Sequence, residues 1–136
     1  MATAPLTPYE QGNLNQTTTW ADCIAWYEDL ARQYPAVLRF EQVGVSDAGV
    51  PIHAGVVSSD GVFDRAAIKA AGRAVFFNNN GIHPGEPEGV DGCMALVRDF
   101  CVEPERLAAL GRTVFLFVPL YNVDGAFNRA DTSRVN

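Results

Sequence analysis

The chain has 136 residues, of which 48% are apolar, and its 16 acidic against 10 basic side chains give a formal net charge of -6. This length and composition predict one soluble domain, since a chain of this size buries roughly 65–70% of the surface that it exposes when unfolded. The acidic balance, with no cluster of Lys and Arg, argues against nucleic acid or an anionic membrane surface as the partner. No apolar run approaches the ~20 residues of a membrane span. The first residues have neither a positively charged end nor an apolar stretch, so they predict no signal peptide.

The first half of the chain predicts an arm, a helix and a hairpin. Residues 1–18 contain few large apolar side chains and predict an extended arm on the surface. Thr19 and Asp22 have the spacing of a helix cap, and apolar residues then recur at helical spacing until the chain reaches Pro35. Residues 37–45 and 50–58 are rich in strand formers and flank a turn sequence, which predicts an antiparallel hairpin.

The second half predicts a strand, a helix and a second strand. After a short helical connection at residues 62–71, the apolar runs 74–77 and 113–120 predict two buried strands. Between them, Pro87 suits the first position of a helix, a turn follows at 106–110, and Cys93 and Cys101 lie on the apolar helix face. We interpret all three cysteines, these two and Cys23, as core residues, because their spacing fits neither a zinc ribbon nor a redox pair. The expected fold class is α/β, with a partial mixed sheet formed by the hairpin and the βαβ unit and flanked by helices.

The candidate chemistry lies where the first of these parallel strands ends. In open α/β sheets, the loops at the carboxyl ends of the strands form the binding crevice. The loop after residue 80 places His83 and Glu86 three positions apart, and an imidazole and a carboxylate are two ligands of the kind that a catalytic zinc uses. Each residue also has a purely structural interpretation. His83 could be a turn residue that hydrogen-bonds its own loop, and Glu86 could be a carboxylate at the positive end of a helix.

Several motifs give the chain a resemblance to a known family. The helix ending in ARQYP, the hairpin with GVPIHAGV, and the runs VFFNNNGIHPGEPEG, FLFVPLYNVDG and SRVN occur in that order. From Thr19 to Asn136 the chain resembles the amino-terminal part of the catalytic domain of a zinc metallocarboxypeptidase of the carboxypeptidase A type. We therefore divide it into an arm, 1–18, and a carboxypeptidase-like portion, 19–136.

The resemblance implies a function and a role for particular residues. His83 and Glu86 match the first two zinc ligands of the family, and Arg134 matches the arginine that binds the substrate and polarises the scissile carbonyl. The implied activity is hydrolysis of the peptide bond at the C-terminus of a peptide substrate, with zinc as cofactor. Asn122-Val123-Asp124-Gly125 replaces the usual NPDG of the family, a departure that a structural turn tolerates. Family members are often exported, so the resemblance is compatible with a periplasmic or secreted protein.

Further parts of the family's site have no counterpart in these 136 residues. The third zinc ligand, a histidine, the Asn-Arg pair that binds the substrate carboxylate, and the glutamate that acts as general base all come later in the family's sequences. The remaining histidine, His53, lies in a predicted strand, and we interpret it as a packed or surface residue rather than a ligand. We therefore expect this chain alone to be an inactive, truncated domain that binds metal weakly and self-associates through an exposed sheet edge.

Two alternative functions remain. A zinc deacylase of the desuccinylase or aspartoacylase type also uses a His-x-x-Glu pair, but acts on N-acyl amino acids; the hairpin before the motif and the late RxN run favour the peptidase. A binding domain without catalytic activity is the second alternative.

Overall fold

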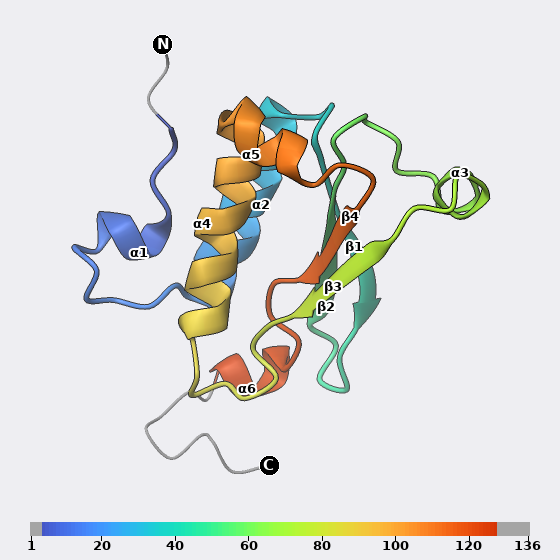
Figure 1. Ribbon diagram of the computed structural model, residues 1–136. Helices are drawn as coiled ribbons and strands as arrows, with labels where there is room; N and C mark the ends of the chain where they lie inside the picture. Colours follow the sequence, from blue (N-terminus) through green and yellow to red (C-terminus); the bar gives the residue numbers. More distant parts are fainter. Residues whose placement is uncertain (1–3, 128–136) are drawn as a thin grey trace.

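The structure is a computed structural model that describes residues 4–127. It confirms the α/β class: a four-stranded mixed sheet is flanked by helices (Figure 1). Along the chain the elements are α1 (Pro8–Gln11), α2 (Trp20–Gln33), β1 (Leu38–Val45), β2 (Pro51–Val57), α3 (Arg65–Ala70), β3 (Val75–Asn79), α4 (Glu88–Val102), α5 (Pro104–Ala109), β4 (Val114–Val118) and α6 (Val123–Phe127). None of the helices in the described part of the chain has the length and apolar character that crossing a membrane requires.

The sheet has the order β1-β2-β4-β3 and contains both predicted units. β1 and β2 form the antiparallel hairpin, closed by a turn in which Gly49 adopts a φ of 81° that few other residues tolerate. β3 and β4 are parallel neighbours joined through α4, so the predicted βαβ unit is confirmed. β2 pairs antiparallel with β4 and joins the two units into one sheet. As a result, the carboxyl ends of β3 and β4 lie side by side.

The core lies between the sheet and the helices α2 and α4, which run along the same face (Figure 1). α2 begins where predicted, because Thr19 Oγ1 accepts a hydrogen bond from the Asp22 backbone N–H, and it ends before Pro35. Tyr27 of α2 packs on Phe117 of β4 with ring centroids 5.0 Å apart, and both side chains are fully buried. Cys23 and Cys93 are buried in this core as free thiols, as expected, and burial raises the pKa of both. Cys101 is half-buried.

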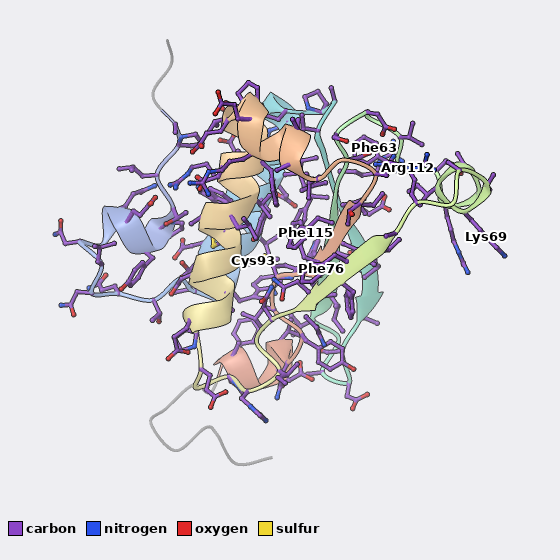
Figure 2. All side chains as sticks on the ribbon, viewed as in Figure 1. Phe63, Lys69, Phe76, Cys93, Arg112 and Phe115 are labelled. Atoms are coloured by element: carbon purple, nitrogen blue, oxygen red, sulfur yellow. The ribbon has the colours of Figure 1, made fainter. Side chains whose placement is uncertain are left out.

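The prediction that the strand beginning near residue 74 is buried is wrong. β3 is an edge strand, and Val75, Phe76 and Phe77 are 52%, 59% and 55% exposed. Phe76 still stacks on Phe115 of β4, with centroids 5.8 Å apart, but within the described residues no element covers the outer edge of β3 (Figure 2). An apolar run indicates a strand suited to burial on both faces, but does not show what covers it.

Two smaller expectations also need correction. The arm at residues 1–18 is not continuously extended, because α1 interrupts it with a complete capping box between Thr7 and Glu10. The arm is also tied to the core: Glu10 forms an ion pair with Arg98 of α4 at 2.5 Å. Pro87 is the N-cap of α4 rather than its first helical residue, a shift of one position.

Candidate metal centre

Two loops leave the sheet together and build the candidate site. Asn79 at the end of β3 pairs with Val118 at the end of β4, so the loop 80–87 begins beside the loop 119–122. Asn80 seals the start of the first loop: its backbone N–H and its side-chain Nδ2 both donate to the Val118 carbonyl, at 3.0 and 3.1 Å. The crevice predicted at the carboxyl ends of the parallel strands is therefore where the motif residues lie.

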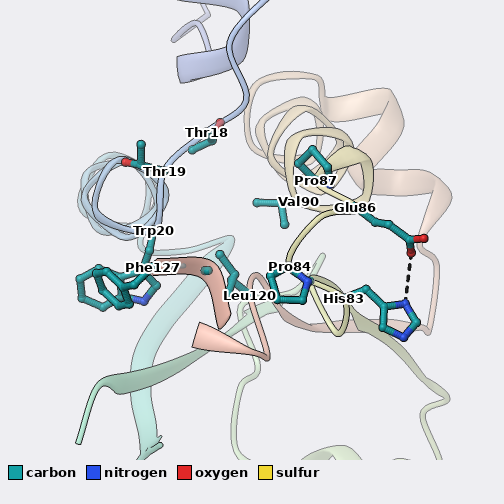
Figure 3. A pocket seen from close by; sticks show the side chains of 12 residues that line it. Thr18, Thr19, Trp20, His83, Pro84, Glu86, Pro87, Val90, Leu120 and Phe127 are labelled. Atoms are coloured by element: carbon teal, nitrogen blue, oxygen red, sulfur yellow. Dashed lines mark hydrogen bonds and ion pairs between the residues drawn. The ribbon is translucent and has the colours of Figure 1, made fainter. Parts of the chain in front are cut away.

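His83 and Glu86 face each other within the first loop. The Glu86 backbone N–H donates to the His83 carbonyl at 3.1 Å, which closes a tight turn and brings the two side chains to the same side. His83 Nδ1 lies 3.2 Å from Glu86 Oε2 (Figure 3). The side chains are 28% and 40% exposed, so solutes can reach both. The structure thus brings together the two residues that the motif singled out.

The separation of these two atoms suits a shared metal ion. Zinc bonds to histidine nitrogen and carboxylate oxygen measure about 2.0–2.2 Å, and in a tetrahedral site two such ligand atoms lie roughly 3.3–3.5 Å apart. The observed 3.2 Å is close to that separation. The pair therefore fits two corners of a tetrahedral zinc site with only small adjustments of the side chains.

The start of α4 adds a favourable field on the carboxylate. Glu86 lies two residues before Glu88, the first residue of α4, and Glu88 and Asp91 add two more acids to its first turn. The amino-terminal end of a helix carries a partial positive charge, and acidic side chains are common and stabilising there.

Within the described residues, no third candidate ligand joins His83 and Glu86. Across 4–127, no group of three or more His, Cys, Asp or Glu side chains is arranged to hold a metal ion. His53 is not near such an arrangement, because it lies in β2, is 8% exposed and stacks on Phe40 with ring centroids 5.4 Å apart. The interpretation of His53 as a packed strand residue is confirmed. Arg134 lies outside the described residues.

A small cavity adjoins the pair. It has a volume of about 240 Å³ and lies between the loop 80–87, the start of α2 and the end of α6. Trp20 and Phe127 form one wall, and their rings pack 5.6 Å apart; His83 and Glu86 lie on the opposite side (Figure 3). The site is thus open on one side and backed by aromatic side chains on the other.

The sequence predicts only an ordinary turn after β4, and it does not predict that the loop 119–122 contacts the loop 80–87. Tyr121 and Asn122 donate their backbone N–H groups to the carbonyls of Asn80 and Gly81, at 2.8 and 3.0 Å. Gly81 has a φ of 61°, which lets the loop bend as it leaves β3. In the sequence, the Asn80-Gly81 and Asp124-Gly125 pairs predict turns, but a turn-forming pair does not show which other loop it will contact.

The described part of the chain is thus an α/β fold with a mixed sheet and a paired histidine and carboxylate in the loop after a parallel strand, and comparison with known proteins identifies its family. Residues 23–136 match the zinc carboxypeptidase family, peptidase M14. The chain therefore belongs to the zinc carboxypeptidase family. Among curated protein sequences, no significant relative was found.

Several solved structures share the fold of this chain. Carboxypeptidase A from Helicoverpa armigera superposes with a TM-score of 0.70 at 16% identity, over 83% of this chain and 26% of that one. Bovine thrombin-activatable fibrinolysis inhibitor, in complex with tick carboxypeptidase inhibitor, gives 0.69 at 20% identity, over 88% and 36%. A metallo-carboxypeptidase from Burkholderia cenocepacia gives 0.62 at 18% identity, over 81% and 28%. The chain thus spans between about a quarter and about a third of the length of these structures.

Proposed function

We propose that this chain carries two of the zinc ligands of a carboxypeptidase-like active site, His83 and Glu86, and that the site serves hydrolysis of the C-terminal peptide bond of peptides. The observation that carries the proposal is the 3.2 Å separation of Nδ1 and Oε2 in a loop at the carboxyl end of β3. The family match over residues 23–136 supports it and favours a peptidase over the deacylase alternative.

The chemistry divides between metal and arginine. A zinc ion held here would polarise the scissile carbonyl and lower the pKa of its bound water towards ~7. We assign Arg134, outside the described residues, to binding the substrate and stabilising the negative charge that develops on the carbonyl oxygen. A guanidinium remains protonated at any working pH, so this role does not depend on a proton.

We expect the 136-residue chain alone to bind zinc weakly and to hydrolyse no peptide. Two protein ligands leave at least half of a tetrahedral zinc shell to water, whereas catalytic sites use three protein ligands. We also propose that the chain self-associates through the edge of β3, where apolar side chains are exposed and, among residues 4–127, no further strand pairs with the backbone.

A zinc titration of the chain tests the ligand assignment. Heteronuclear NMR of the imidazole nitrogens is suited to it, because the chain has only two histidines and His53 is buried. Zinc should shift the ring signals of His83 and leave those of His53 unchanged, with a dissociation constant weaker than micromolar. His83→Ala and Glu86→Ala should each remove this binding.

Two variants serve as matched controls. Glu88→Ala removes an exposed carboxylate two residues from Glu86 and should leave zinc affinity unchanged. Arg134→Ala should do the same, because Arg134 is assigned to the substrate rather than to the metal. Zinc binding that survives His83→Ala would refute the assignment. Loss of zinc in Arg134→Ala would make that arginine structural, and submicromolar affinity in the parent chain would show that further ligands exist.

A further inference from the structure

The carbonyl groups that precede His83 are held by the neighbouring loop rather than by their own. The carbonyls of Asn80 and Gly81 accept the two backbone hydrogen bonds from Tyr121 and Asn122 described above, and the Asn122 side-chain amide reaches the Ile82 carbonyl at 3.5 Å. Three successive peptide groups are thus tied to the loop after β4. The backbone path into His83 is set by residues about 40 positions away in sequence.

The contact after His83 is steric. A Cβ atom on Gly125 would lie 2.3 Å from Pro84 Cγ, far below any normal contact distance, so a larger residue forces one of the two segments to move. Pro84 directly follows His83 in the chain. The backbone of Gly125 therefore packs directly against Pro84, in the loop 80–87 that carries His83 and Glu86.

The turn between β1 and β2 holds the segment around Gly125 in place. The Asp124 carboxylate accepts a hydrogen bond from Ser46 Oγ at 2.6 Å and a longer one from the Ala48 backbone N–H at 3.4 Å. Ser46 lies in the turn between β1 and β2, where its Oγ also accepts from the Val50 backbone N–H at 3.0 Å. Asn122 Oδ1 accepts a hydrogen bond from the Gly125 backbone N–H at 3.0 Å, which closes a turn over residues 122–125. The hairpin turn is thus connected to Pro84 through Asp124 and Gly125.

The contacts of this loop are important because the side chains of His83 and Glu86 are partly exposed. His83 and Glu86 are 28% and 40% exposed, so packing of their own side chains fixes the positions of the candidate ligand atoms only in part. Ligand geometry in a metal site is sensitive to shifts of about 0.5 Å, and loss of a supporting contact typically costs 10–100-fold in metal affinity.

We propose that Gly125, Asn122 and Asp124, with Ser46 of the hairpin turn, form a positioning unit that sets the spacing of His83 and Glu86. The inference rests on the proposed zinc site. It deepens that proposal by assigning metal affinity to a segment that contributes no ligand, and to a hydrogen bond between residues 78 positions apart in sequence.

The primary test is Gly125→Ala in the 136-residue chain. We expect zinc affinity, measured through the His83 ring signals, to fall about tenfold or more. Gly92→Ala is the matched control, because a Cβ on this α4 glycine meets nothing within 4 Å, and it should leave zinc affinity unchanged. In the double variant Gly125→Ala/Pro84→Ala, the atom nearest to the new Cβ is gone while Asn122 Oδ1 and Cγ remain at 2.9 and 3.1 Å, so affinity should be restored only in part relative to Gly125→Ala. Pro84→Ala alone reports the effect of removing the proline.

A gentler variant covers the case in which Gly125→Ala does not fold. Ser46→Ala removes the hydrogen bond to Asp124 without adding an atom, and we expect zinc affinity to fall about threefold with the two-state unfolding transition preserved. Unchanged affinity in every folded variant of the pair Gly125→Ala and Ser46→Ala would overturn the proposal.

The metal-free chain separates this inference from the proposed function. Without zinc, the ring nitrogen shifts of His83 report its contact with Glu86, and they should change in Gly125→Ala but not in Gly92→Ala. A parent chain whose His83 signals ignore zinc would refute the zinc site, and the metal-free shifts would then decide the positioning role. If those shifts are identical in Gly125→Ala and the parent, the positioning unit is refuted even where zinc binds.

Discussion

The centre of the sheet and its β3 edge are made of the same kinds of residue but have opposite environments. Val57, Val114 and Phe117 of β2 and β4 are at most 2% exposed, whereas Val75, Phe76 and Phe77 of β3 are all more than half exposed. Val57 and Phe117 belong to the core that packs with α2 and α4, whereas Phe76 stacks on Phe115 and is still more than half exposed (Figure 2). Position relative to the helices, rather than hydrophobicity, therefore decides which strand stabilises this part of the chain.

The largest expected effect contrasts one phenylalanine from each region. Phe117→Ala should lower the free energy of unfolding by about 3–5 kcal/mol, because it empties space between Tyr27 and the sheet. Phe77→Ala makes the same chemical change at the edge and should cost less than about 1 kcal/mol. Urea unfolding followed by circular dichroism measures both. Equal losses would show that the edge is covered in solution.

A smaller effect tests the covered region by pH. Burial lowers the pKa of His53 below its ordinary value, against the opposing influences of Glu28 and of a hydrogen bond with the Pro51 backbone. As pH falls below about 6.5, the unfolded chain takes up a proton that folded His53 resists, so stability should decrease by up to about 1.4 kcal/mol per pH unit. Above that pH, His53 is neutral in both the folded and the unfolded chain, so it causes no loss of stability.

The matched variant for this test is His53→Phe. It keeps a ring against Phe40 but has no nitrogen to titrate, so the part of the pH dependence that belongs to His53 should vanish. Urea unfolding at several values between about pH 7.5 and 5.5 gives the two curves. Parallel curves for the parent and His53→Phe would mean that His53 titrates alike in the folded and unfolded chain.

The smallest effect on stability belongs to the edge, where association is the informative measurement. Phe77→Lys should change the free energy of unfolding by less than about 1 kcal/mol, because the side chain is 55% exposed. A lysine on an edge strand opposes pairing with another chain, so sedimentation should show less self-association than in the parent. Val43→Lys, on β1 at the other edge, is the control. A parent chain that remains monomeric at high concentration would refute self-association.

Most elements of the fold could be predicted because their signals are local. Thr19 caps α2, and Gly49 closes the hairpin with its positive φ. The exposure of β3 could not be predicted, because an apolar run reports what a strand can bury and not which elements are present to cover it.

The site divides in the same way. His83 and Glu86 are three residues apart, and a motif makes such a pair visible in sequence. The bond from Ser46 to Asp124 joins positions 78 residues apart, and the approach of Gly125 to Pro84 leaves no trace in either local sequence. Contacts that depend on the closed sheet become visible only once the sheet is assembled.

The loop that carries both candidate ligands is connected to two parts of the molecule. After Glu86 it leads within two residues into α4, whose Met94 and Val97 are buried in the core, and before His83 the carbonyls of Asn80 and Gly81 are hydrogen-bonded to the loop that follows β4. A zinc ion bound by His83 and Glu86 would link the start of α4 to the end of the sheet. Part of its binding free energy would then appear as resistance of α4 to local opening, which hydrogen exchange along that helix records.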